Sequence, residues 1–156
     1  MIAVVQRVSE ARVKVGDSVV GEIGAGLLAL VSVVRDDGAK DVAWMASKLT
    51  SLRIFRNGVG TGEITGERKH FDRSVIDVGG AVLLVSNFTV AADTKKGRRP
   101  SFDAAAAPEA GRVIFDQFVD AVRATGVPVA TGEFGGDMRV SLVNDGPATF
   151  IVNSRA

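Results

Sequence analysis

Residues 26–34, GLLALVSVV, form an apolar run of strand length that only Ser32 interrupts. A run without polar alternation is typical of a strand buried on both faces. Residues 81–88, AVLLVSNF, have the same character. These two runs predict a sheet whose central strands are covered from both sides, and the other elements are assigned around them.

Further strands are expected on either side of these runs. Gly16-Asp17-Ser18 separates two short apolar segments and is a hairpin signal. Near the C-terminus, apolar and polar residues alternate until Val143 breaks the period. The additional strands are predicted at Ile2–Val8, Ala11–Val15, Val19–Ile23, Met138–Leu142 and Ala148–Val152.

Two segments change to helical spacing. The first is Ala39–Leu52, and the second begins at Pro108, a favoured first residue of a helix, and continues to about Thr125. Their expected buried faces are Val42, Met45, Ala46, Leu49 and Leu52 in the first, and Ile114, Phe115, Phe118, Val119 and Val122 in the second.

The predicted class is α+β, with a curved, mostly antiparallel, barrel-like sheet covered by two main helices. No repeat, linker or low-complexity segment divides the sequence, so residues 1–156 are expected to form one domain. Asn57–Gly66, which holds four glycines, and Thr89–Pro108 are expected as long loops.

The composition excludes several classes of protein. The chain has no cysteine and one histidine, so we expect no disulfide, no metal site and no cofactor. The net charge of +1 does not indicate a nucleic-acid binder, although a local basic patch is compatible with one. Arg7 and Glu10 interrupt the N-terminal region, and the longest apolar run is about half of what a bilayer requires, so a cytoplasmic protein without membrane contact is expected.

Several catalytic arrangements lack their residues. A Ser-His-Asp triad would need His70, which lies in the charged stretch ERKHFDR, where an exposed loop histidine is the expectation. The glycines of residues 21–26 and 58–62 do not have the spacing of a phosphate-binding loop. The acidic residues are scattered, so paired-carboxylate chemistry has no obvious site.

Three polar segments remain as candidates. Ser86, Asn87, Phe88 and Thr89 end a very apolar strand; they form either a simple polar strand end or part of a site. Residues 144–149, NDGPAT, form either an ordinary turn or a rigid gauge for a ligand. Lys95, Lys96, Arg98 and Arg99 form either a solvated cluster or a set of phosphate contacts.

In this order and context, the segments resemble the D-aminoacyl-tRNA deacylase family. The resemblance covers nearly the whole chain, and its two signature motifs correspond to Ser86–Val90 and Asn144–Thr149. It is supported by Gln6-Arg7-Val8, Gly26-Leu27-Leu28, Arg53-Ile54-Phe55, Ala91-Ala92-Asp93-Thr94 and Arg99-Pro100-Ser101-Phe102.

The resemblance implies hydrolysis of D-aminoacyl-tRNA, and of glycine mischarged on tRNA, by a homodimer whose active site lies at the interface. Its partner is the aminoacylated 3′ end of tRNA, with no DNA. A cis Gly146–Pro147 bond would exclude L-amino acids from the partner's site, with Arg7 holding the segment. The other implied residues are Ser86, Asn87, Phe88 and Thr89 for catalysis, and Met138, Asn144 and Thr149 for substrate binding.

Backbone N–H groups near Phe88 and Thr89, together with the terminal 2′-hydroxyl of the RNA, are the implied means of catalysis. An alternative makes the Thr89 hydroxyl the nucleophile, although the motif supplies no adjacent base. The chain departs from the family at Asn87, where Gln is usual, at Val90 and Ala148, and in residues 69–73. Because Asn87 replaces the usual Gln, an alternative function remains: a tRNA-binding accessory module with weak or no activity. A dimerisation domain and a hydrolase of other esters or D-peptides are further alternatives.

Overall fold

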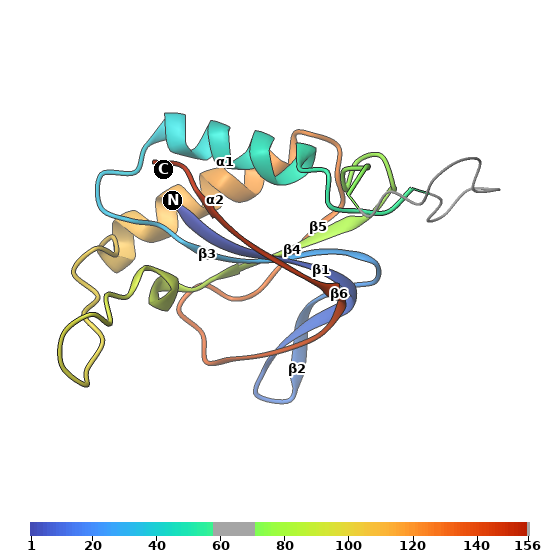
Figure 1. Ribbon diagram of the computed structural model, residues 1–156. Coiled ribbons are helices and arrows are strands. Elements are labelled where there is room, and N and C mark those ends of the chain that lie inside the picture. Colours follow the sequence, from blue (N-terminus) through green and yellow to red (C-terminus); the bar gives the residue numbers. More distant parts are fainter. Residues whose placement is uncertain (58–70, 156) are drawn as a thin grey trace.

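The computed structural model describes residues 1–57 and 71–155. In chain order the elements are β1 (Ile2–Val15), β2 (Ser18–Ile23), β3 (Gly26–Ser32), α1 (Ala39–Ser51), β4 (Ala81–Ser86), the 3-10 helix η1 (Phe88–Ala91), α2 (Pro108–Arg123), β5 (Val129–Thr131) and β6 (Met138–Asn153). The predicted α+β class with two main helices is confirmed. Figure 1 shows the two helices side by side over one face of the sheet.

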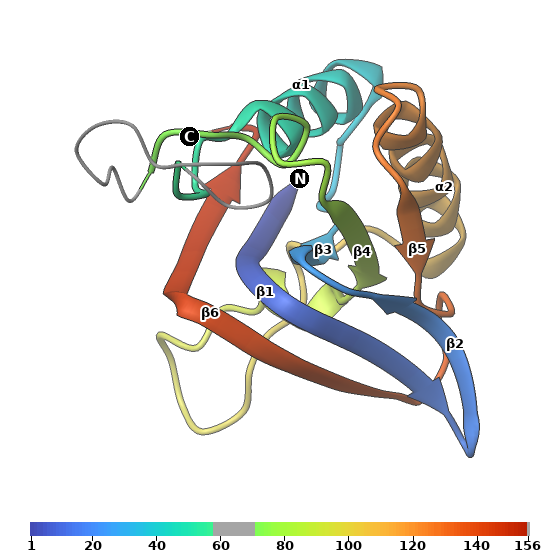
Figure 2. The same ribbon diagram turned by 90° about the vertical axis from the view of Figure 1, so that its right-hand side faces the viewer.

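The described strands form one curved, six-stranded sheet. Its order is β2-β1-β3-β4-β5, and β6 pairs with β1. The pairings of β1 with β2, β3 and β6 are antiparallel, whereas β3–β4 and β4–β5 are parallel. Figure 2 shows how the strands curl into a barrel-like layer with the helices outside it.

Strands β3 and β4 are buried on both faces, as their apolar runs predict. Leu27 and Ala29 of β3 face a core formed with α1 and α2. Leu28 packs on the opposite side, in a second core inside the curve of the sheet. In β4, Leu84 belongs to the first core and Leu83 to the second.

The helical faces are confirmed, with small changes at their ends. In α1 the predicted residues are buried up to Leu49, and Leu52 lies just beyond the helix, partly exposed. Pro108 is the first residue of α2, as predicted, and of its predicted face only Ile114 is partly exposed.

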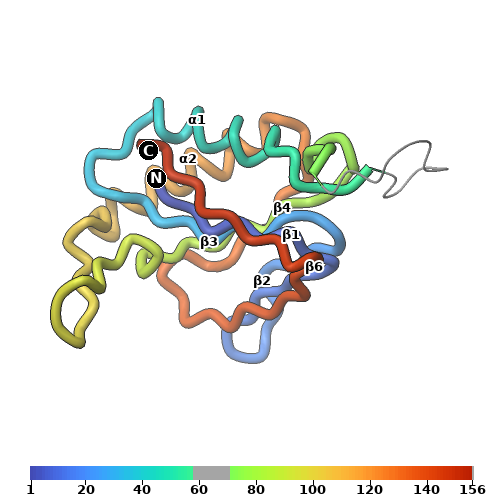
Figure 3. Tube along the Cα trace, viewed as in Figure 1, coloured from blue at the N-terminus to red at the C-terminus, as the bar shows by residue number. Residues whose placement is uncertain are grey.

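Several predicted boundaries are wrong. The segments predicted as Ile2–Val8 and Ala11–Val15 are one strand, β1, because β6 pairs with both halves. The segments predicted as Met138–Leu142 and Ala148–Val152 are likewise one strand, β6, which Figure 3 shows running alongside β1. The predicted Thr89–Pro108 loop begins within η1. One isolated bridge, Asp93–Ser101, lies inside it, and a second, Val34–Ala105, ties it to the segment just after β3.

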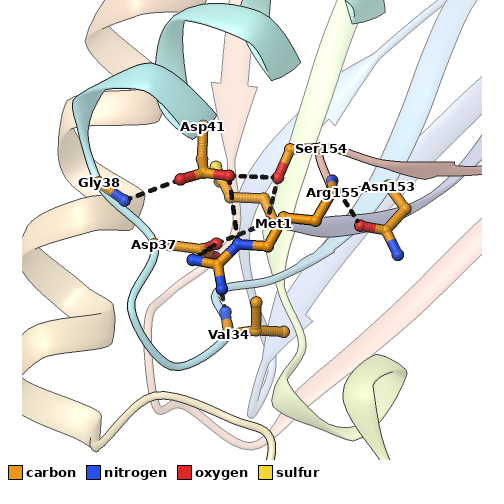
Figure 4. Close-up of polar contacts among 8 residues, drawn as sticks. All are labelled: Met1, Val34, Asp37, Gly38, Asp41, Asn153, Ser154 and Arg155. Atoms are coloured by element: carbon orange, nitrogen blue, oxygen red, sulfur yellow. Dashed lines mark hydrogen bonds and ion pairs between the residues drawn. The ribbon is translucent and has the colours of Figure 1, made fainter.

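A polar cluster joins the first residue, the start of α1 and the end of β6 (Figure 4). The Met1 ammonium lies 2.8 Å from the Asp37 carboxylate and donates to Ser154 Oγ at 2.7 Å. Ser154 Oγ in turn donates to Asp41 at 2.6 Å. This hydroxyl, followed by the Gly38 N–H, holds the pKa of Asp41 below its usual value. The cluster fixes α1 to the last strand.

Candidate active site

A cavity of about 860 Å³ lies where β4 ends. The carboxyl ends of parallel strands are common ligand sites in sheets, and β4 runs parallel to both of its neighbours. Most of the wall is apolar, and β3, α2 and the inner face of β6 each contribute to it. A large apolar cavity with a few polar groups is the usual form of a small-molecule site.

The polar edge of the cavity comes from the end of β4 and the residues that follow it. Ser86, Asn87 and Phe88 line it. The Phe88 side chain is 58% exposed, and its ring meets that of Phe102 edge to face at 5.1 Å between centroids. An exposed aromatic pair at a cavity mouth offers a flat apolar surface to a ligand ring.

Met138 lines the cavity from the first residue of β6. Its sulfur accepts a hydrogen bond from the Glu133 N–H at 3.3 Å. Gly132 leaves the space for this sulfur, since a Cβ there would approach it to 2.6 Å. The thioether is therefore held in one place by its own preceding loop.

Residues 145–148 form a bulge in β6, and the predicted turn between two strands is wrong. Gln6 pairs with Thr149 and Val8 with Asn144, so Arg7 alone stands opposite these four residues. The Gly146–Pro147 peptide bond is cis. Asn144 closes the bulge, because its Oδ1 accepts from the Ala148 N–H at 2.7 Å and its Nδ2 donates to Thr149 Oγ1 at 2.9 Å.

Arg7 is 3% exposed and fastens the bulge to the body of the protein. Its Nε donates to the Asp145 carbonyl at 2.8 Å, and its Nη1 donates to the Ile54 carbonyl at 2.5 Å. Nε also lies 3.2 Å from the Asp145 carboxylate. Arginine is rarely buried unless it is paired, and here both Nε and Nη1 of the guanidinium donate to backbone carbonyls.

The structure brings together some of the predicted residues and not others. The residues that line the cavity are Ser86, Asn87, Phe88 and Met138. The predicted residues outside its lining, among those described, are Arg7, Thr89, Asn144, Gly146, Pro147 and Thr149. The last four belong to the bulge of β6 or flank it, which makes two separate groups within one chain.

The side chains of the basic segment, Lys95, Lys96, Arg98 and Arg99, are exposed. The Asp93–Ser101 bridge closes its base, with reciprocal backbone bonds of 2.8 and 2.9 Å. Phe102, which lines the cavity, follows directly. The four cations therefore stand on a loop that begins and ends near the candidate site.

Sequence reasoning assigned no role to several residues that shape the site. Phe134 and Phe102 line the cavity, and only Phe102 lies in a segment that resembles the family. The Ile54 carbonyl accepts from Arg7, but a backbone acceptor leaves no signal in its own side chain.

The remaining expectations concern His70 and its neighbours, a metal site and a membrane-spanning helix. His70, with Lys69 of the altered 69–73 stretch, lies outside the described residues. Within residues 1–57 and 71–155, no group of three His, Cys, Asp or Glu side chains is placed to hold a metal ion. No helix in the described part of the chain is long and apolar enough to cross a membrane.

Comparison with known proteins identifies relatives across the full chain. A sequence profile of the family described as D-Tyr-tRNA(Tyr) deacylase matches residues 4–153. A D-aminoacyl-tRNA deacylase of Geobacter sulfurreducens is 50% identical over 100% of this chain and 97% of its own length. That of Pelobacter propionicus is 53% identical over 97% of this chain and 99% of its own.

Two solved structures share the fold. A protein described as c-Myc DNA Unwinding Element Binding Protein superimposes with a TM-score of 0.90 and 35% identity, over 100% of both chains. A probable eukaryotic D-amino acid tRNA deacylase superimposes with a TM-score of 0.78 at 17% identity, over 97% of this chain and 98% of its own.

Proposed function

The chain belongs to the D-Tyr-tRNA(Tyr) deacylase family, and on that premise we propose that it hydrolyses the ester bond of D-aminoacyl-tRNA. The products are the free D-amino acid and tRNA. Glycine mischarged on tRNA is a second substrate of the same site, because glycine is achiral and has no side chain for a chiral filter to exclude.

The observation that carries this proposal is the cavity at the end of β4. It offers Ser86, Asn87 and Phe88 at its polar edge and a large apolar space behind them. An aminoacyl ester is already activated, so water needs only orientation and a donor for the developing oxyanion. The Phe88 N–H has no acceptor among the described residues and is the candidate donor. Water adds to the carbonyl carbon, the ester C–O bond breaks, and the ribose oxygen leaves with a proton.

The terminal adenosine fits the mouth of the same cavity. Its base is placed against the aromatic pair of Phe88 and Phe102, because stacking on aromatic rings is the common way to hold an unpaired base. The neighbouring ribose hydroxyl then lies beside the ester and assists the reaction. The cations at Lys95, Lys96, Arg98 and Arg99 contact phosphates further along the 3′ end.

The chiral filter is assigned to Gly146 and Pro147. Discrimination between D- and L-amino acids with many side chains requires contact with the groups that all of them share, the amine and Cα. Backbone atoms that Arg7 and Asn144 hold in place exclude the wrong stereoisomer more rigidly than a side chain that can change rotamer. The filter works by steric exclusion of the L form.

A homodimer follows from the position of this filter. Gly146 and Pro147 are exposed and are not part of the cavity lining among the described residues of the same chain. Exposed apolar side chains accompany them on β6, with Val143 51% and Ile151 77% exposed. We therefore assign the bulge of one protomer to the cavity of its partner, so that each active site is composite.

The test is deacylation of matched D- and L-aminoacyl-tRNA, with glycyl-tRNA as a third substrate. We expect fast hydrolysis of the D ester and of the glycyl ester, and no hydrolysis of the L ester. A D-amino-acid ester without RNA is the control for a general esterase. Binding of tRNA without hydrolysis of any ester would favour the accessory-module alternative that Asn87 raises.

A further inference from the structure

The Asn87 side chain folds back on its own segment. Its Oδ1 accepts from the Thr89 N–H at 3.2 Å and from the Thr89 hydroxyl at 2.5 Å. The backbone N–H is a donor only, so the amide atom that faces it must be the oxygen. With that oxygen in place, the Thr89 hydroxyl must donate to it as well.

This arrangement is a side-chain cap on η1, whose first residue is Phe88. Asn suits the position because its short side chain reaches the N–H two residues ahead. The cap has two consequences for Thr89. Its amide and its hydroxyl proton are both occupied, and its side chain is not part of the cavity lining among the described residues.

We propose that Asn87 is a positioning residue, which holds the 86–91 segment in shape by binding both donors of Thr89 and thereby leaves the Phe88 N–H as the donor that faces the substrate. The inference rests on the proposed function, since it concerns the same site. The hydroxyl of Thr89 is then a structural partner of Asn87. It is not a nucleophile, because an amide oxygen is too weak a base to take its proton.

The first measurement is hydrogen exchange of the Thr89 amide in the full-length protein, followed by NMR. Asn87→Ala removes the cap and is expected to speed this exchange about fivefold, whereas Asn87→Ser keeps a capping oxygen and holds the rate near that of the wild type. Asn153→Ala is the matched control, since Asn153 Oδ1 accepts the Arg155 N–H in the same way, far along the chain. That variant leaves Thr89 exchange unchanged.

The second measurement is kcat/KM on D-aminoacyl-tRNA. Asn87→Ala is expected to lower it about fivefold, Asn87→Ser to restore most of the loss, and Thr89→Val to slow hydrolysis without abolishing it. Because the two side chains act through one contact, the double variant Asn87→Ala with Thr89→Val is no slower than Asn87→Ala alone.

Two outcomes would overturn the proposal. One is unchanged Thr89 exchange in Asn87→Ala, and the other is multiplication of the two single effects in the double variant. If the wild-type protein hydrolyses none of the three esters, the proposed function fails, and the exchange rates still decide whether the cap exists.

Discussion

Arg7 joins two segments that are far apart in the chain, since its guanidinium donates to the carbonyls of Ile54 and Asp145. Its planar fork suits two acceptors in fixed directions, which a lysine ammonium does not reproduce. The Phe71 ring lies 6.0 Å from the guanidinium carbon and covers it further. The position of the β6 bulge thus depends on one buried side chain.

Arg7→Ala is therefore expected to lower the free energy of unfolding by about 2–3 kcal/mol, because it leaves the buried Ile54 carbonyl and the partly buried Asp145 carbonyl without their donor. Urea denaturation measures this. Arg12→Ala is the matched control, as Arg12 forms only an exposed ion pair with Glu22, and we expect little change there. Equal effects of the two substitutions would contradict the role given to Arg7.

Gly146 is the second residue with little freedom, because its φ is +148° and a Cβ would lie 2.8 Å from Ala148 N and 3.0 Å from Arg7 Nη2. Gly146→Ala should cost about 1–3 kcal/mol of stability and displace the proposed filter. Deacylation of D- and L-esters should then show lost activity, lost discrimination, or both. Gly24→Ala, with open space around it, is the control. Full D-selectivity in Gly146→Ala would refute the filter.

Among the elements, those with a clear apolar pattern were predictable. β3 and β4 follow from their uninterrupted apolar runs, and the buried faces of α1 and α2 follow from helical periodicity. β5 was missed because it has three residues, all partly exposed, and no periodicity. The continuity of β6 was missed because Asn144–Pro147 has the composition of a turn, while pairing with β1 keeps the chain extended on both sides.

The start of α1 should be sensitive to acid. The pKa of Asp41 is lowered by the Ser154 hydroxyl and the Gly38 N–H, so its carboxylate stabilises the fold at neutral pH, and this contribution is lost as the pH falls through the lowered folded-state pKa. Asp41→Asn is expected to have a lower Tm at pH 7 and a flatter decline toward pH 3. Asp120→Asn, at an exposed site on α2, is the control. Parallel Tm curves for wild type and Asp41→Asn would contradict the assignment.

The basic loop should contribute affinity and not selectivity. Neutralising Lys95, Lys96, Arg98 and Arg99 to glutamine is expected to weaken tRNA binding and to reduce its salt dependence by roughly 0.7 in the log–log slope for each phosphate that is no longer neutralised, with D/L discrimination unchanged. Filter binding over a salt series measures both quantities. Lys40→Gln with Lys48→Gln, on the exposed side of α1, is the control. Unchanged affinity and slope would show that the loop is only a solvated surface.

At the scale of the whole molecule, the proposed composite site can be tested by a complementation experiment. Phe88→Ala alters the cavity, and Gly146→Ala alters the bulge. A heterodimer of the two variants, isolated through different affinity tags, contains one site with both changes and one with neither. We expect it to regain roughly half of the wild-type D-selective activity. No regain over the two single variants would place both groups in the same protomer's site.

The candidate residues could be singled out from the sequence, but their arrangement in space could not. The polar segments at 86–89 and 144–149 stand out by composition, and resemblance supplied their roles. Which of them share a cavity depends on pairings across the chain, such as β1 with β6, that no local pattern encodes. Asn87 illustrates the same limit: its side chain faces its own segment, which only the hydrogen bonds to Thr89 reveal.

The two register shifts between β1 and β6 cancel in parity. From Gln6 to Glu10 is 4 steps along β1, and from their partners Thr149 to Val143 is 6 steps along β6, a difference of an even number. Even-numbered residues of β6 therefore face inward on both sides of the bulge, from Met138 to Val152. A change of length within 145–148 is therefore expected to be absorbed in the unpaired bulge, so that Met138, Val140 and Leu142 stay inward as long as the flanking pairs Gln6–Thr149 and Val8–Asn144 persist.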